Sequence, residues 1–212
     1  MTKLTAFAKK FPTRSYQAKE VILHQDDTVK CGFFILSGKV RVYDINNLGE
    51  EKPLSYEKQD EIFPINYLYL DSLNSPYYYE AYTDCKLAII PKKNYMEFIE
   101  SNPDVLLLTT KALVARYSDF NRRINGLTQL KAKNKVLHAL KYFSRRHGDR
   151  KIKGKTLINI PMPQQELANF AGLTRETVSS VMSKLKKRKV VSYDSNKPMK
   201  VDKDKINKDL DK

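Results

Sequence analysis

Residues 163–185 read PQQELANFAGLTRETVSSVMSKL, and this segment sets the architecture of the C-terminal part of the chain. Pro163 can open a helix, because the backbone N–H that it lacks has no partner in the first helical turn. Gly172 can adopt the left-handed conformation that ends such a helix, and the Thr174 hydroxyl can cap the next one. The segment therefore predicts two helices joined by a tight turn, a helix-turn-helix.

The second helix of this pair has an apolar face and a polar face. Four apolar residues recur at i, i+3, i+4 and i+7, the spacing of a single buried stripe. They are Val178, Val181, Met182 and Leu185. The opposite face is short and polar, which suits a recognition helix in the major groove, where Arg can bind guanine and Glu can accept from cytosine. We expect the DNA contacts to come from Gln164, Gln165, Thr174, Arg175, Glu176, Ser179, Ser180, Ser183, Lys184 and Lys187.

Basic and β-forming segments surround the helix pair. Residues 186–189 are four consecutive cations, and residues 190–193 and 199–201 read as strands joined by a turn at 196–198. This hairpin predicts a wing that lies beside DNA phosphates. The elements expected upstream are a helix at 133–144, a basic loop containing two glycines at 145–155 and a strand at 156–160.

Charge is divided unequally along the chain. The formal charge is +15, but residues 1–120 hold 15 Lys and Arg against 16 Asp and Glu, whereas residues 121–212 hold 24 against 8. Cationic side chains release counterions from phosphates and so drive binding to polyanions. A lysine-rich surface without a nucleic-acid partner would spread its charge over both halves. The imbalance therefore indicates polyanion binding by the C-terminal half.

The N-terminal part consists of short β-forming runs. Turn signals at Ser37-Gly38 and at residues 46–49 (NNLG) supply residues that tolerate positive φ in tight hairpins. Closely spaced antiparallel strands of this kind predict a β-sandwich or barrel. The runs rich in β-branched and aromatic residues are 20–23, 33–36, 39–43 and 87–90.

A long helix is expected between these two parts. The chain from Asp104 to about Thr128 contains no proline and reaches its first glycine at Gly126. Its apolar positions are separated alternately by four and three residues, an a/d heptad repeat interrupted at Thr110. We expect this stripe to pair with that of a second chain, the alternative being a helix packed only on its own domain. The predicted dimerisation residues are Leu106, Leu113, Tyr117, Phe120, Ile124 and Leu127.

Both parts of the chain resemble the Crp/Fnr family of transcription regulators. Residues 164–168 (QQELA) and 172–179 (GLTRETVS) resemble that family's helix-turn-helix pattern, and residues 32–43 (GFFILSGKVRVY) resemble its β-roll signature. The resemblance covers nearly the whole chain and implies an α+β fold. Its expected parts are a jelly-roll-like sensor domain at 1–103, a dimerisation helix at 104–130 and a winged helix-turn-helix at 131–212.

The resemblance also implies partners. Members of this family bind a two-fold symmetric operator as homodimers, and they contact RNA polymerase or exclude it. The residues that match Arg175, Glu176 and Ser179 make base and phosphate contacts in the family. Ser180 stands where many relatives carry a base-reading arginine, so we expect an operator other than the family's commonest half-site.

The sensor part departs from the relatives that bind cyclic nucleotides. Those relatives hold the cyclic phosphate with an arginine, whereas no arginine occurs here between Arg41 and Arg116. Phe120-Asn121 replaces the polar pair that contacts adenine in them. We therefore do not expect cyclic AMP to be the effector. Aromatic rings could line a pocket for an apolar or aromatic effector or could simply fill the domain interior. The candidate pocket residues are Tyr67, Tyr69, Tyr82 and Phe120.

Other kinds of site are poorly represented. Cys31 and Cys85 form no C-x-x-C pair, and the three histidines are isolated, so we expect no metal or cofactor. Buried cysteine in strands behaves as a small hydrophobe, with a redox switch as the alternative. The absence of a leader and of a long apolar run predicts a cytoplasmic protein without membrane association.

An enzyme is not expected either. The sequence holds no nucleophile elbow and no phosphate-binding glycine loop. The alternative function is a small-molecule-binding regulatory subunit whose basic tail docks on protein or RNA.

Overall fold

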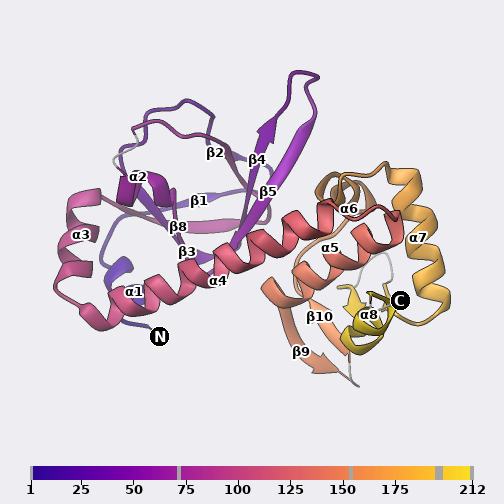
Figure 1. Ribbon diagram of the computed structural model, residues 1–212. Coiled ribbons are helices and arrows are strands. Elements are labelled where there is room, and N and C mark those ends of the chain that lie inside the picture. The colour runs from indigo at the N-terminus through magenta and orange to yellow at the C-terminus, as the bar shows by residue number, and fades with distance from the viewer. Residues whose placement is uncertain (1, 71–72, 153–154, 194–197, 211–212) are drawn as a thin grey trace. The chain divides into compact units, whose positions relative to one another are not determined.

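The computed structural model describes residues 2–70, 73–152, 155–193 and 198–210. The chain divides into two compact units, Met1–Ala112 and Leu113–Lys212 (Figure 1). The first unit holds a β-sandwich, the second holds a helix-turn-helix with a small sheet, and a long helix belongs to both. The fold is therefore α+β, as the sequence predicts.

The N-terminal unit is built on two four-stranded sheets. All neighbouring strands are antiparallel. Side chains from both sheets, including Phe34, Leu87, Val40 and Ala81, form one buried cluster, so the core lies between the sheets. The first sheet has the order β1 (Thr13–Tyr16), β8 (Cys85–Ile90), β3 (Gly32–Ser37), β6 (Ile62–Phe63). The second has the order β2 (Val21–Leu23), β7 (Tyr78–Ala81), β4 (Lys39–Ile45), β5 (Glu51–Lys58).

The predicted turn at Ser37-Gly38 is confirmed, and it requires glycine. Gly38 has φ +93°, which side chains rarely adopt. A Cβ built there would lie 2.3 Å from the carbonyl oxygen of Asp84. The chain can therefore pass from β3 to β4, and so from one sheet to the other, only because this position has no side chain.

Four helices accompany the sandwich: α1 (Lys3–Ala8), α2 (Ile65–Leu70), α3 (Lys92–Glu100) and the long α4 (Pro103–Leu127). The predicted long helix at 104–128 corresponds to α4. The short helices α1 and α2 were not expected, nor were the strands β1, β5, β6 and β7. All of these elements except β5 have six residues or fewer, too few to show a clear periodicity. The strand β5 has eight residues, but Pro53 and four charged side chains weaken its β-forming pattern.

The C-terminal unit packs four further helices on a four-stranded antiparallel sheet. Its helices are α5 (Ala132–Arg146), α6 (Gln164–Ala171), α7 (Arg175–Lys187) and α8 (Lys203–Leu210). The sheet has the order β11 (Val191–Ser192), β12 (Lys200–Val201), β10 (Lys155–Ile158), β9 (Gly148–Ile152). The core is supplied largely by α5, where Val136, Leu137 and Leu140 are fully buried.

Two expectations for this unit need correction. The basic segment 145–155 is not a loop, because α5 continues to Arg146 and residues 148–152 form β9, which pairs with β10. The strand β9 has the sequence GDRKI, and glycine and charged residues are uncommon in strands, so the sequence does not indicate a strand here. The helix α8 was also missed. The predicted turn at 196–198 lies partly outside the described residues, at 196–197.

Candidate DNA interface

The helix pair α6 and α7 is shaped by its end residues. Gly172 ends α6 in the left-handed conformation, with φ +63° and ψ +47°, as predicted. Thr174 caps α7: its Oγ1 accepts a hydrogen bond from the Thr177 backbone N–H at 3.3 Å. Pro163 stands one position before α6 as the cap residue rather than as its first helical residue.

A buried stripe orients α7 on the rest of the unit. Val178, Met182 and Leu185 are buried as predicted, whereas Val181 is only half-buried. They face a core that includes Phe170 of α6, whose ring packs on that of Phe143 with centroids 4.7 Å apart. Because this stripe is covered, the opposite face of α7 must point away from the core.

That opposite face carries most of the residues expected to contact DNA. Their spacing from Arg175 to Lys187 places them on one stripe of the helix. In the part of the chain that the structure describes, Arg175 and Glu176 form no ion pair, so both side chains are available to a ligand. The exposed members are Arg175, Glu176, Ser180, Ser183, Lys184 and Lys187, and Ser179 is half-buried.

Three other candidate residues lie at the start of the two helices. Gln164 and Gln165 occupy the first turn of α6. The Gln165 side chain donates to Asn169 Oδ1 at 2.8 Å, one helical turn further on. The Thr174 hydroxyl that caps α7 also lies 3.0 Å from the hydroxyl oxygen of Thr177. The structure therefore assigns Thr174 a capping role, which leaves its hydroxyl oxygen partly occupied.

An ion pair that the sequence reasoning missed holds the end of α7. Arg188 donates two hydrogen bonds of 2.6 Å to the carboxylate of Asp209 on α8. Asp209 is only 4% exposed, and Lys133 of α5 lies 3.5 Å from it. These cations lower the pKa of Asp209, the Arg188 hydrogen bonds most of all. No local signal could reveal this contact, because its partners are 21 residues apart.

The start of the wing is attached to α7 by one lysine. Lys186 Nζ donates to the Tyr193 carbonyl at 3.1 Å and lies 4.7 Å from the centroid of the Tyr193 ring. Next to it, β11 pairs with β12, which pairs with β10. The predicted wing strands are thus present and are continuous with a larger sheet.

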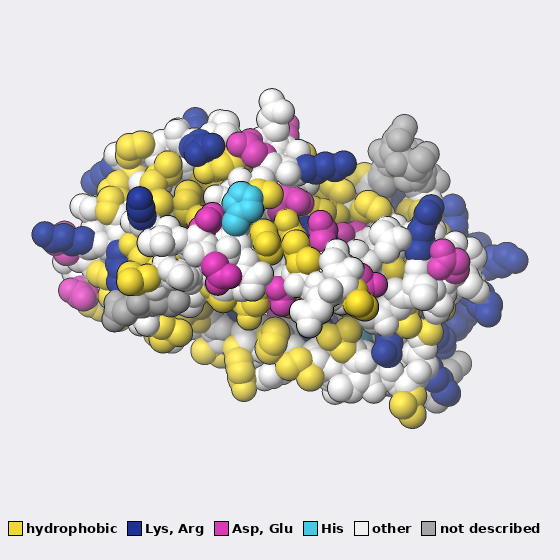
Figure 2. Space-filling view, turned by 90° about the horizontal axis from the view of Figure 1, so that it is seen from above, with side chains coloured by type: hydrophobic (Ala, Val, Ile, Leu, Met, Phe, Trp, Pro, Cys, Tyr) yellow, Lys and Arg dark blue, Asp and Glu magenta, His cyan; other side chains and the backbone are white. Residues whose placement is uncertain are grey.

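Positive charge is concentrated on this unit. Figure 2 shows Lys and Arg side chains gathered most densely over the C-terminal unit, at the right of the view, whereas over the rest of this face they are scattered among Asp and Glu. The charge imbalance counted along the sequence is therefore present on the folded surface. A surface of this kind attracts polyanions.

The predicted dimerisation residues lie on α4, and most of them are uncovered in the single chain. Tyr117 is 67% exposed and Phe120 is 52% exposed. Leu113 is half-buried. The remaining exposed members of the stripe are Leu106, Ile124 and Leu127. The apolar stripe of α4 is therefore largely exposed in the single chain.

The candidate effector residues are not brought into one cluster by the described contacts. Tyr67 and Tyr69 lie on α2, not on a strand. Tyr67 is buried in the core, and the Tyr69 hydroxyl lies 2.9 Å from that of Tyr95. Tyr82 packs edge-on against Tyr56, with ring centroids 5.2 Å apart. Phe120 belongs to the other unit.

Buried charge in the sandwich is already paired. Arg41 is buried, contacts Glu51 at 2.5 Å and Glu80 at 4.0 Å, and stacks over the Tyr43 ring. Burial raises the pKa of Tyr43 to about 12. Across the described residues no group of three or more His, Cys, Asp or Glu is arranged to hold a metal ion. Nor does any described helix have the length and apolarity needed to cross a membrane.

Each of the two units matches the model of a known domain family. Residues 13–102 match the cyclic nucleotide-binding domain, and residues 134–204 match the Crp-like helix-turn-helix domain. The cAMP-activated global transcriptional regulator CRP of Haemophilus influenzae is 23% identical over 181 residues, which are 83% of this chain and 78% of that protein.

Two solved structures share the fold. A CooA mutant from Carboxydothermus hydrogenoformans has a TM-score of 0.79 at 19% identity, covering 99% of this chain and 92% of that one. A cyclic nucleotide-binding domain containing protein from Listeria monocytogenes has a TM-score of 0.77 at 18% identity. The match covers 95% of this chain and 97% of that one. The chain therefore joins a cyclic nucleotide-binding domain to a Crp-like helix-turn-helix, and it belongs to the Crp/Fnr family of DNA-binding transcription regulators, which are not enzymes.

Proposed function

We propose that the protein is a homodimer that reads a two-fold symmetric operator in the major groove with α7. The observation that carries this proposal is the exposed polar face of α7, which is held outward by the buried Val178, Met182 and Leu185. Arg175 and Glu176 lie in the first turn, where recognition helices reach base edges. Arg175 is assigned to guanine, Glu176 to cytosine N4, and Ser179 to a base or phosphate.

The remaining candidate residues contact the backbone or adjust the fit. Lys184 and Lys187 lie toward the end of α7 and are suited to phosphates. Gln164 and Gln165 start α6, where exposed N–H groups and the helix dipole favour a phosphate. Ser180 and Ser183 are short enough to let the helix approach the base edges. Thr174 orients this arrangement through its cap.

Dimerisation is assigned to the apolar stripe of α4. Support comes from the heptad spacing and from the exposure of Tyr117, Phe120 and Ile124 in the single chain. A parallel pair of such helices would cover these side chains. It would also present two α7 helices to two half-sites, as a symmetric operator requires.

We further propose that the effector is not cyclic AMP. The H. influenzae relative is named as cAMP-activated. In this chain, however, no arginine lies between Arg41 and Arg116 to hold a cyclic phosphate, and Arg41 is already paired with Glu51 and Glu80. Candidate contacts for an aromatic effector within the N-terminal unit are Tyr69 and Tyr82, which are half-buried; Tyr67 belongs to the core.

A selection experiment tests the proposal. Purified full-length protein should enrich a dyad sequence from random duplexes at moderate salt, and native mass spectrometry should report a dimer. Binding of all duplexes with equal, salt-labile affinity would instead indicate a basic surface without base reading. The proposed place of action is the cytoplasm, where the dimer would contact RNA polymerase or exclude it from a promoter.

A further inference from the structure

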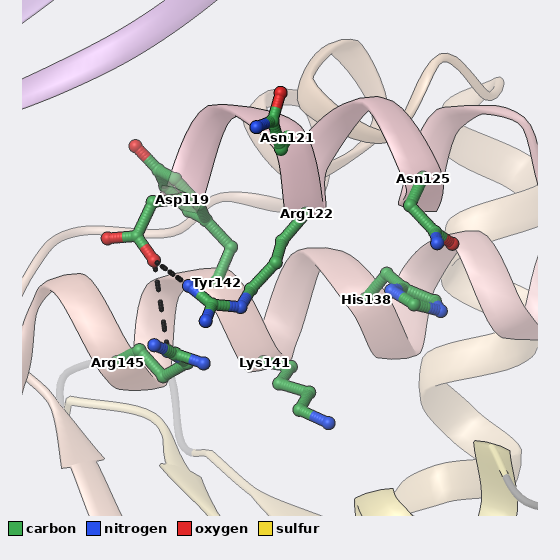
Figure 3. A pocket seen from close by; sticks show the side chains of 8 residues that line it. All are labelled: Asp119, Asn121, Arg122, Asn125, His138, Lys141, Tyr142 and Arg145. Atoms are coloured by element: carbon green, nitrogen blue, oxygen red, sulfur yellow. Dashed lines mark hydrogen bonds and ion pairs between the residues drawn. The ribbon is translucent and has the colours of Figure 1, made fainter. Parts of the chain in front are cut away.

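The C-terminal unit contains a charged cavity that DNA reading does not use. It lies between α4 and α5, has a volume of about 360 Å³, and is open to solvent on one side. This volume falls in the lower part of the range of small-molecule sites, about 300–1,000 Å³. Figure 3 shows its lining residues, which are Asp119, Asn121, Arg122, Asn125, His138, Lys141, Tyr142 and Arg145.

The charges in this cavity do not balance. Arg122, Lys141 and Arg145 line the cavity together with a single carboxylate, Asp119. Both guanidinium groups contact the same oxygen of that carboxylate, Oδ1, at 3.2 Å from Arg122 and 3.8 Å from Arg145. Since a guanidinium group has five N–H donors, each arginine keeps donors that Asp119 does not use. Among the described residues, no carboxylate pairs with Lys141.

The arrangement of the side chains creates a place for an anion. Arg122 extends from α4 toward α5, and Arg145 extends from α5 toward Asp119 on α4 (Figure 3). Asp119 is only 16% exposed, so it holds both guanidinium groups in defined positions. Each guanidinium group is a planar fork of N–H donors, and two of them presented from facing helices suit the several oxygens of a phosphate.

The rest of the cavity offers ring surfaces and hydrogen-bonding groups. Tyr142 is buried, and its ring is fixed against Phe170, with centroids 4.8 Å apart. His138 and Asn125 lie at the opposite end of the cavity from Asp119 (Figure 3). Burial and the nearby Lys141 lower the pKa of His138, which favours the neutral imidazole, a group that can accept or donate a hydrogen bond.

We propose that this cavity binds a small phosphorylated metabolite. Its phosphate would lie between Arg122 and Arg145, and its organic part would extend along Tyr142 toward His138. A purely structural interface between two helices would be filled with apolar side chains, whereas these facing residues are long and charged. The site is separate from the sandwich and from the exposed face of α7, so this chain has a second ligand-binding position.

Titration calorimetry on the full-length protein without DNA tests the proposal independently of operator binding. The probes are inorganic phosphate, glucose 6-phosphate and AMP, with glucose and adenosine as uncharged controls. At least one phosphate probe should bind saturably, and neither uncharged control should. Preference for an ester over inorganic phosphate would identify the organic part as recognised. Absence of saturable binding for all three phosphate probes would overturn the proposal.

Variants locate the site. Arg122→Gln and Arg145→Gln should each weaken phosphate binding by about tenfold or more, because each removes a charged fork. Lys208→Gln removes the same charge from an exposed position in the same unit and should leave binding unchanged. Asp119→Asn removes the competing negative charge but keeps an amide oxygen that can accept from both guanidinium groups, and it should tighten binding, an effect that general damage to the fold cannot produce. Equal affinities in both arginine variants and the parent protein would overturn the assignment.

A spectroscopic readout places the ligand. Addition of the bound probe should shift the ring resonances of His138, whereas those of His24 in the N-terminal unit should not move. A shift of His24 alone would place the anion elsewhere and overturn the proposal. So would a loss of affinity for every DNA duplex in both arginine variants without any small-anion binding, because the cations would then serve the DNA backbone.

Discussion

Gly126 of α4 lies directly against His138 of α5. A Cβ built at Gly126 would lie 2.7 Å from His138 Cβ, closer than side chains tolerate. His138 Cβ is attached to the backbone and cannot rotate away. The crossing of these two helices is therefore set by the absence of a side chain at one position. At the other end of the interface, Asp119 and Arg145 join the same two helices.

This crossing predicts that Gly126→Val destabilises the C-terminal unit. Overpacking of a close contact costs about 1–3 kcal/mol, and the two helices would have to separate to admit the side chain. Chemical denaturation of the full-length protein should show this loss of unfolding free energy. Ala115→Val places the same side chain at an exposed position of α4 and should change stability by no more than about 0.5 kcal/mol. Equal effects of the two substitutions would contradict the predicted close contact.

Glu176→Ala should relax base discrimination without abolishing DNA binding. The substitution removes an acceptor for cytosine N4, so the preference at one base pair per half-site should fall by about 1–3 kcal/mol. Competition binding with operators substituted at each position measures this preference. Asp204→Ala removes an exposed carboxylate of α8 and serves as the control. Uniform losses on every sequence would assign Glu176 a structural role instead.

The Arg188–Asp209 ion pair predicts an acid-sensitive contribution to stability. Its hydrogen bonds lower the pKa of Asp209 in the folded state, so the contribution is present above the unfolded value of about 3.9 and is lost as pH falls below it. Asp209→Asn should therefore lower the melting temperature at neutral pH, and the difference from the parent protein should shrink below about pH 4. A difference that stays constant from neutral to acid pH would show that the carboxylate charge is unimportant.

Tyr117→Glu should convert the protein to monomers. The substituted position lies in the predicted seam of α4, and burial of an unpaired carboxylate at an interface costs several kcal/mol. We expect the dimer dissociation constant to rise by at least about 100-fold in sedimentation equilibrium. Ala115→Glu, at an exposed position of α4 outside the seam, should leave the dimer intact. A parent protein that is monomeric at micromolar concentration would refute the seam itself.

The elements that the sequence predicted correctly depend on interactions between near neighbours. Thr174 caps α7 because its hydroxyl meets an N–H three residues away, and Gly172 ends α6 because it lacks a Cβ. The helices α4 and α7 follow from a periodicity repeated over several turns. The strand β9 escaped prediction, since it contains Gly148, Asp149, Arg150 and Lys151 and is formed by pairing with β10. The helix α8 likewise packs on distant residues.

The sequence by itself determined that this chain has a β-rich N-terminal part, a long apolar-striped helix and a basic helix-turn-helix, because caps, turns and periodicity act over a few residues. Only the tertiary structure decided that Asp209 holds Arg188, that Gly126 sets the approach of α4 to α5, and that Arg122 and Arg145 face one cavity. These relationships join residues 12 to 23 positions apart on different elements. Their distances depend on how whole helices pack, which no local pattern encodes.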